Sequence, residues 1–265
     1  MSMIISAALS NIGRVRENNE DNYFINGVTL SLEMAEPGAV ADETEGAGLY
    51  AVCDGLGGGE HGELASAIAV DTLRETFSRM KDQDVAVDKV IDWFTHTAND
   101  RICAEMERLN SWSMGTTFVV LGIRDDTVRI YNLGDSRAYL LWKSNIKQLT
   151  RDHTKAKELV DMGLLTEEQA KTHPERNQLT QHLGIYSEDM EVEPYKVPAF
   201  KLMAGDKLLL CSDGLTDMLG DQEILDIMSV DSSPSEIAEA LVGVALQRGG
   251  KDNITVIVAL PSANV

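Results

Sequence analysis

Cysteine, aromatic residues and positive charge are all scarce in this 265-residue chain, and each shortage narrows the class of protein. The three cysteines, Cys53, Cys103 and Cys211, form no Cys-x-x-Cys pair, and their odd number is typical of a reducing compartment. Lysine and arginine number 23 against 43 aspartates and glutamates, which leaves a formal net charge of −20. Because such a surface repels nucleic-acid phosphates and anionic lipid, we expect neither nucleic acid nor a membrane as the main partner.

Several other signals are also absent. No apolar run has the length that a membrane span requires, and residues 1–9 lack the basic and long apolar regions of a signal peptide. The Gly-Lys-Ser/Thr of a P-loop does not occur, and no cysteine is followed six residues later by the arginine of a cysteine phosphatase. With no repeats and no clear linker, residues 1–265 are expected to form one cytoplasmic, monomeric domain.

Runs of β-type residues bounded by turn residues predict strands along the whole chain. They lie at 4–9, 23–25, 49–53, 117–123, 128–133, 137–142, 191–197, 207–211 and 254–260. We expect 117–123, 128–133 and 137–142 to pair as one antiparallel meander. The acidic segment 31–46 has no periodicity and is predicted to be a solvent-exposed loop.

Helical periodicity appears in two consecutive long segments and near the C-terminus. Apolar residues recur at helical spacing over 63–80 and 87–109, which predicts a helical layer packed on a sheet. Ser233-Pro234-Ser235-Glu236 opens a third helix, and Asp221 is the expected N-cap of another. Residues 151–186 are polar and lack an apolar stripe. Within them, Thr166-Glu167-Glu168-Gln169 is a capping box, and we expect a surface subdomain or lid.

One stretch combines a buried strand with an unusual ending, Val52-Cys53-Asp54-Gly55-Leu56-Gly57-Gly58-Gly59. The apolar run delivers one carboxylate, and the glycines after it allow backbone to approach a ligand closely. A second run ends in the same way, in Cys211-Ser212-Asp213-Gly214-Leu215. The spacing of Gly57, Gly59 and Gly62 also satisfies the dinucleotide fingerprint. That match is weak, because helix follows helix where a second strand is required.

Five acidic positions lie beside glycine or at the edge of a predicted strand. A single Asp-Gly is most simply a turn, but five such positions that each abut an apolar strand favour a shared site. Carboxylates without histidine or cysteine neighbours favour magnesium or manganese over zinc. The acidic positions are Glu20-Asp21, Asp54, Asp135, Asp213 and Asp252.

These fragments together resemble the metal-dependent Ser/Thr protein phosphatases of type 2C, also called PPM phosphatases, and in particular the compact bacterial members. The resemblance covers nearly the whole chain and follows the family order. It rests on Arg16-x-x-x-Glu20-Asp21, Asp54-Gly55-Leu56-Gly57-Gly58, Gly62-Glu63-x-Ala65-Ser66, Met114-Gly115-Thr116-Thr117, Gly134-Asp135-Ser136-Arg137, Ser212-Asp213-Gly214-Leu215 and Asp252-Asn253-Ile254-Thr255.

The resemblance implies an α+β fold, in which helices cover both outer faces of a two-sheet antiparallel β-sandwich and residues 151–186 form a flap. It implies that Asp54 bridges two manganese or magnesium ions, with the Gly55 carbonyl on one of them. Asp21, Asp213 and Asp252 would supply further ligands, and Asp135 with Asp213 would mark a third, weaker site. Two such cations can acidify a bridging hydroxide that attacks phosphorus directly.

Three further residues receive roles by the same resemblance. Arg16 would bind the phosphoryl oxygens through its fork of donors, and Glu20 would orient bound water. The chain departs from the family at two positions. Eukaryotic members carry a histidine, a candidate acid for the leaving group, at the position of Leu56, and bacterial relatives usually carry methionine there and a histidine at the position of Gly59. His61 lies nearby and is a candidate acid, although an exposed loop histidine is the simpler interpretation.

The leading hypothesis is therefore a phosphatase that acts on phosphoserine and phosphothreonine in proteins, opposing a cognate Ser/Thr kinase. One alternative is a catalytically silent member that binds phosphoproteins, but such a member commonly loses ligands that this chain retains. The other alternative is a small-molecule phosphohydrolase on the same site, which would turn over phosphometabolites in preference to phosphoproteins.

Overall fold

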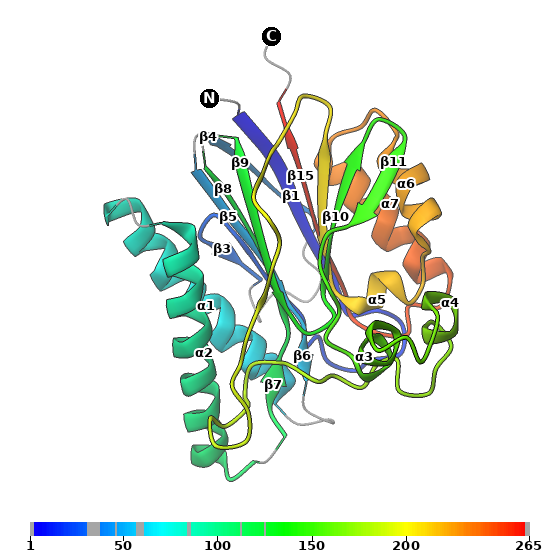
Figure 1. Ribbon diagram of the computed structural model, residues 1–265. Coiled ribbons are helices and arrows are strands. Elements are labelled where there is room, and N and C mark those ends of the chain that lie inside the picture. The colour runs from blue at the N-terminus through cyan, green and yellow to red at the C-terminus, as the bar shows by residue number, and fades with distance from the viewer. Residues whose placement is uncertain are drawn as a thin grey trace.

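The structure is a computed structural model that describes residues 3–30, 38–45, 47–56, 61–83, 86–111, 113–124 and 126–262. Two antiparallel sheets pack face to face in its centre, and helices cover their outer faces (Figure 1). The expected sandwich is confirmed. Ser31–Pro37, Gly46, Asp125 and the glycines at 57–59 lie outside the described residues.

The first sheet has the strand order β11-β10-β14-β15-β1-β4. Its strands are β11 (Asn145–Gln148), β10 (Arg137–Trp142), β14 (Lys207–Cys211), β15 (Ile254–Pro261), β1 (Met3–Asn11) and β4 (Val40–Glu45). The second sheet has the order β12-β9-β8-β5-β2-β3, and β13 also pairs with β9. Its strands are β12 (Tyr195–Lys196), β9 (Thr127–Leu133), β8 (Phe118–Arg124), β5 (Ala47–Cys53), β2 (Asn22–Ile25), β3 (Val28–Thr29) and β13 (Phe200–Lys201).

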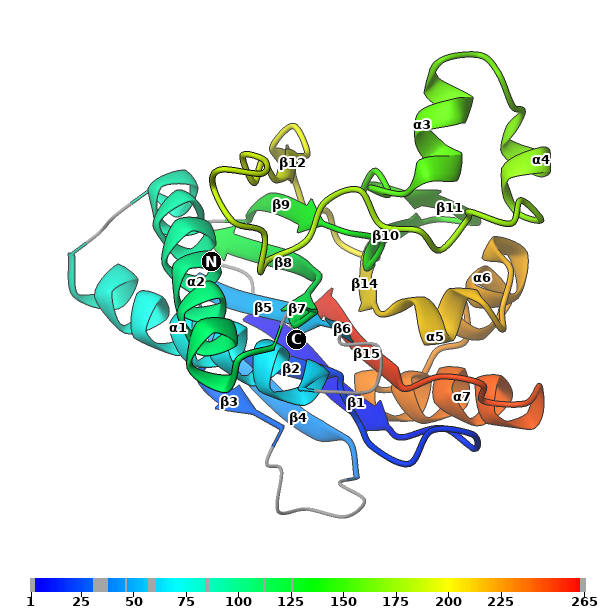
Figure 2. The same cartoon turned by 90° about the horizontal axis from the view of Figure 1, so that it is seen from below.

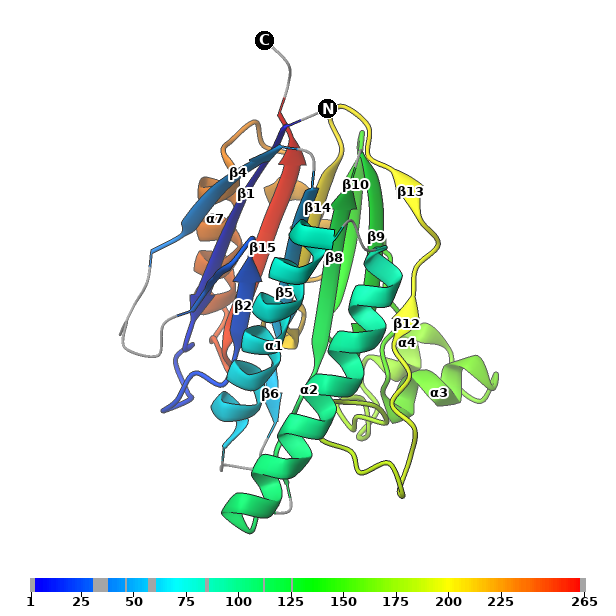
Figure 3. The ribbon, with the colours of Figure 1, turned by 90° about the vertical axis from the view of Figure 1, so that its left-hand side faces the viewer.

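Helices close both outer faces of the sandwich, as Figure 3 shows from the side. The long helices α1 (Gly62–Gln83) and α2 (Val87–Leu109) cover the second sheet, and α6 (Asp221–Met228) and α7 (Pro234–Gln247) cover the first. The short helix α5 (Asp213–Thr216) directly follows β14. The remaining helices, α3 (Lys155–Asp161) and α4 (Glu167–Ala170), stand away from the sheets and lie within residues 151–186, the segment predicted to be a flap (Figure 2).

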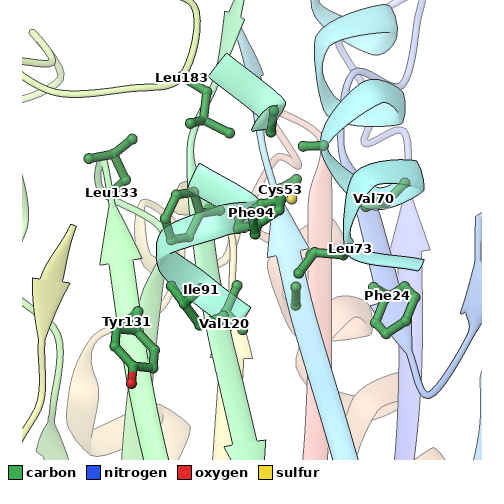
Figure 4. Packing of buried hydrophobic residues seen from close by; sticks show 14 of the residues in the cluster. Phe24, Cys53, Val70, Leu73, Ile91, Phe94, Val120, Tyr131, Leu133 and Leu183 are labelled. Atoms are coloured by element: carbon green, nitrogen blue, oxygen red, sulfur yellow. The ribbon is translucent and has the colours of Figure 1, made fainter. Parts of the chain in front are cut away.

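The central strands are continuous apolar runs because both of their faces are buried. In β5, Leu49 and Cys53 face the α1–α2 layer, whereas Tyr50 and Val52 face the other sheet. Figure 4 shows Cys53 among Phe94, Leu73 and Val70. Three apolar layers result: one under each pair of helices and one between the sheets.

Several sequence-based expectations need correction. Residues 40–45 are not loop but the edge strand β4, which pairs along β1 from Met3↔Glu45 to Ala8↔Val40. Backbone pairing there overrides an acidic composition that has low β-propensity. The expected meander is also wrong in its third strand: β8 pairs with β9, but β10 crosses to the other sheet and pairs with β14 and β11.

Two boundaries also differ from the prediction. The strand expected over 191–197 is reduced to Tyr195–Lys196. Helix α6 begins at Asp221, so its N-cap is Gly220, whose N–H donates to the Glu223 carboxylate at 3.0 Å. The capping box at Thr166 is confirmed, and so is the helix start at Ser233, which also forms a capping box with Glu236.

Phe94 tests how much the α1–α2 layer contributes to stability. Its ring is fully buried and meets Phe118 edge-on, with ring centroids 5.1 Å apart. We expect Phe94→Ala to lower the free energy of unfolding by about 3–5 kcal/mol in urea titrations, because a large cavity remains in the core. The exposed Val230→Ala should change it by less than about 0.5 kcal/mol. Equal effects in the two variants would contradict this packing.

Candidate metal centre

Strand register gathers the predicted acidic residues at one end of the sandwich. Asn22 pairs with Cys53, so the preceding Asp21 and the following Asp54 come together from neighbouring strands. In the other sheet, Cys211 pairs with both Arg137 and Val256. Those pairings place the segments that carry Asp135, Asp213 and Asp252 at the same edge. Five aspartates from distant parts of the chain thus meet at the strand ends.

The electrostatics show that these carboxyl groups lie within reach of one another. Burial, together with the charges of Asp213 and Asp252, raises the pKa of Asp21 to about 7, even though it accepts hydrogen bonds. Burial and the charge of Asp252 raise the pKa of Asp213 to about 6. The pKa of Asp54 is raised well above its usual range by burial and by the other four aspartates. Each of these three carboxyl groups therefore holds its proton to a higher pH than a solvent-exposed carboxyl group does.

Asp135 shows the same effect, since burial and the charge of Asp213 raise its pKa well above the usual range. The cation beside it is Arg137, and this guanidinium is already paired with Asp152 through a 2.6 Å contact. Within the described part of the chain, no three acidic, histidine or cysteine side chains converge at ligand distance on a single point. The donors are nonetheless all oxygens, which suits a hard divalent cation.

The backbone around the two Asp-Gly pairs explains their glycines. A Cβ at Gly55 would lie 2.3 Å from the Gly62 carbonyl oxygen, and one at Gly214 would lie 1.9 Å from that of Asn253. Both contacts are far below the separation that a side chain tolerates. The glycines therefore provide the clearance expected from the sequence, and Gly214 brings Asp213 against the segment of Asp252.

Hydroxyl groups hold the acidic residues in place. Ser212 Oγ donates to Asp21 at 2.7 Å. Thr116 Oγ1 and the Thr117 N–H both donate to the Asp54 carbonyl, at 2.9 and 2.8 Å, and Thr117 Oγ1 lies 2.7 Å from Ser136 Oγ. These hydroxyl residues belong to the motifs found in the sequence, but the motifs alone predict no role for them. In the sequence, only their position next to the acidic residues and glycines points to a function at the centre.

Arg16 lies at the solvent edge of the centre. Its Nη2 donates to Asp252 at 2.6 Å, and its side chain is 51% exposed. Asn253 fixes the loop that carries it: Nδ2 donates to the carbonyls of Ile12 and Asn18 at 2.9 Å each, and Oδ1 accepts from the Glu20 N–H at 2.8 Å. Arg16 and Asp252 are thus brought together.

Glu20 and His61 are placed differently from each other. Burial and the charge of Glu63 raise the pKa of Glu20, whose carboxylate lies at the start of α1 beside Gly62. His61 directly precedes this helix with a positive φ of 70°. Its charge acts on Glu105 of α2, where it adds to the hydrogen bond from Arg108 in lowering the pKa of that carboxyl. Glu20 thus lies against Gly62, and His61, the residue directly before Gly62, also acts through its charge on α2.

Comparison with known proteins identifies the family. The family model described as protein phosphatase 2C matches residues 38–243. The chain belongs to the protein phosphatase 2C family. It is a metal-dependent Ser/Thr protein phosphatase of the bacterial type that the motifs predict, so the predicted family, fold and enzyme class are confirmed.

Individual relatives support the same assignment. The chain is 34% identical to a Ser/Thr phosphatase stp of Listeria welshimeri, over 92% of this chain and 91% of that protein. It superposes on the solved Mycobacterium tuberculosis phosphatase PstP with a TM-score of 0.81 at 33% identity, covering 98% and 100% of the two chains. A PstP catalytic domain solved with two manganese ions has a TM-score of 0.77 at 32% identity, covering 99% and 100%.

Two further observations concern the hydropathy of the helices and the state of the cysteines. No helix in the described ranges has the length and hydropathy of a membrane-spanning segment. All three cysteines are free and buried, and Cys53 and Cys211 belong to the apolar core.

The raised pKa values of this phosphatase predict how its metal-free stability depends on pH. Asp21 titrates near 7 and Asp213 near 6 in the fold, against about 3.9 when unfolded. A raised carboxyl pKa stabilises the fold below the unfolded value, and that stability is lost as pH rises through the folded value. Chelator-treated protein should therefore lose free energy of unfolding between about pH 4 and about pH 7. Urea titrations of Asp21→Asn should show a shallower loss; an unchanged slope would contradict the prediction.

Proposed function

We propose that Asp54 bridges two manganese or magnesium ions in this phosphatase, with Asp21, Asp213, Asp252 and the Gly55 carbonyl as further ligands. The observation that carries the proposal is a partly buried group of carboxylates that raise one another's pKa. Such a group is stabilised by cations far more than by protons at neutral pH. The two manganese ions of the related PstP domain support the same number of ions.

Asp135 and Asp213 are proposed to hold a third, weaker cation. Asp135 is half-buried, and burial together with the charge of Asp213 raises its pKa, which supports a cation shared by the two carboxylates. Asp135 lies in the turn between β9 and β10, whereas Asp21 directly precedes β2. The proposal therefore adds a ligand from a third segment of the chain to the group around Asp54.

When bound, the two central cations would supply Lewis acidity, which activates water and neutralises charge on the phosphoryl group. Side chains of the protein would bind the phosphate ester and orient the water. Arg16 has a fork of donors at the solvent edge, where a phosphate ester can enter, and its exposure leaves those donors accessible. Glu20, held by Asn253, can accept a hydrogen bond from a water at the centre and so orient it. His61 directly precedes Gly62 and is the candidate side chain for protonating the leaving group, with solvent as the alternative proton source.

The substrates are phosphoproteins, and we propose that they carry phosphoserine or phosphothreonine placed by a cognate Ser/Thr kinase. We further propose that residues 1–265 act as one monomeric, cytoplasmic catalytic domain with its flap at 151–186. Three free, buried cysteines support a reducing location. A silent binding protein is disfavoured, because Arg16 and the acidic residues are all present and gathered at one end. A phosphohydrolase of small molecules would be recognised by faster turnover of phosphometabolites than of phosphopeptides.

Asp54→Asn tests the central assignment. It keeps the shape of the side chain but removes the bridging charge, so turnover of p-nitrophenyl phosphate and of a phosphothreonine peptide with manganese should fall to the level seen with chelator. Asp226→Asn, at an exposed position on α6, is the matched control and should retain full activity. Near-normal rates in Asp54→Asn, or wild-type turnover that survives chelation, would contradict the proposal.

Arg16→Ala separates substrate binding from metal binding. The loss of a charge-assisted hydrogen bond costs about 1.5–3 kcal/mol, so kcat/KM for the phosphopeptide should fall roughly 10- to 150-fold. Arg14→Ala is the control, since Arg14 lies in the same loop, is exposed, and anchors that loop through its backbone N–H to Gly250 at 2.7 Å. Steady-state kinetics in which the two variants lose activity equally would exclude a specific phosphate contact by Arg16.

A further inference from the structure

His153 is a buried histidine to which the proposed chemistry gives no role. It lies at the entry to the flap and is only 7% exposed. Its ring nitrogen Nδ1 accepts a hydrogen bond from the Gly134 N–H at 3.0 Å, and its own backbone N–H donates to the Gly134 carbonyl at 3.0 Å. Both bonds end on the residue that directly precedes Asp135.

The turn that His153 holds is connected to the acidic centre on its other side. Gly134 has a φ of +96° and packs directly on Thr117. Thr117 Oγ1 in turn lies 2.7 Å from Ser136 Oγ and accepts from the Asp54 N–H at 3.3 Å. The backbone of Asp135 is therefore fixed between the threonine that orders Asp54 and the imidazole of His153.

The flap depends on the same histidine. The His153 carbonyl accepts from the Thr180 N–H at 2.8 Å, where the returning chain of the flap passes. The next residue, Thr154, forms a β-bridge with Leu179 and caps α3. The ring is neutral near pH 7, because burial and the charge of Arg151 lower its pKa to about 4. With Nδ1 accepting, the ring proton lies on Nε2.

We propose that His153 is a positioning residue that fixes the Gly134–Asp135 turn to the base of the flap, and so sets the geometry of the weaker cation site. This inference rests on the proposed function, since it takes Asp135 to be a ligand. His153 touches neither substrate nor metal. Its side chain contributes one acceptor, Nδ1, for the Gly134 N–H, while the His153 backbone N–H and Asn132 Nδ2 donate to the Gly134 carbonyl. Hydrogen-bonded neighbours orient metal ligands elsewhere in the same way.

Manganese binding to chelator-treated protein, followed by isothermal titration calorimetry, tests the proposal without relying on activity. In His153→Ala the weakest binding event should lose about 10- to 100-fold in affinity, the usual effect of removing such a neighbour, while the tightest event stays within about twofold. His173→Ala is the matched control, because this flap histidine only accepts from the Glu175 N–H within the flap. Wild-type affinities in His153→Ala would overturn the proposal.

A second pair of variants keeps the test decisive if His153→Ala does not fold. The Asn side chain places an oxygen where Nδ1 stands, whereas Gln places its polar group near Nε2. His153→Asn should therefore retain the weak site and slow deuterium exchange at the Gly134 amide, and His153→Gln should lose both. Equal behaviour of the two would overturn the proposal. Failure of the proposed function would look different, because the wild-type protein itself would then bind no manganese.

Discussion

The burial of like charges at one end of the sandwich is the constraint on which the rest of this phosphatase depends. Five aspartates converge here, Asp21 buried and the other four half-buried, and burial is the first cause of the raised pKa of Asp21, Asp54, Asp135 and Asp213. Such a group would separate if it were carried on flexible loops. The fold prevents this by placing each acid within two residues of a strand.

Rigidity at the strand ends comes from the layered core. Every strand at the centre of the two sheets is covered on both faces, so its end cannot move without disturbing an apolar layer. Local hydrogen bonds from Thr116, Thr117, Ser212 and Asn253 then fix individual carbonyls and carboxylates. Holding like charges together in this way lowers the stability of the fold, but it gives the binding site a fixed geometry.

Sequence reasoning found the acidic residues because each directly abuts an apolar run, and a strand end next to glycine is a strong local signal. It missed β4 because the acidic residues of 40–45 pair through their backbone, which leaves no apolar pattern in the side chains. It also assigned β10 to the wrong sheet, because the choice between two sheets depends on long-range pairing with β14. The role of His153 was equally hidden, since only the folded chain brings it to Gly134.

The chain enters and leaves the segment 155–178 beside two isolated β-bridges, and this affects how much the length of that segment can vary. Thr154 bridges Leu179, and Leu183 bridges Thr116 beside Asp54, so the segment between 155 and 178 leaves and re-enters the body at nearly one place. For a loop whose ends are already joined, added length costs little further entropy. The segment can therefore be lengthened or shortened with little effect on the stability of the body that carries the acidic centre.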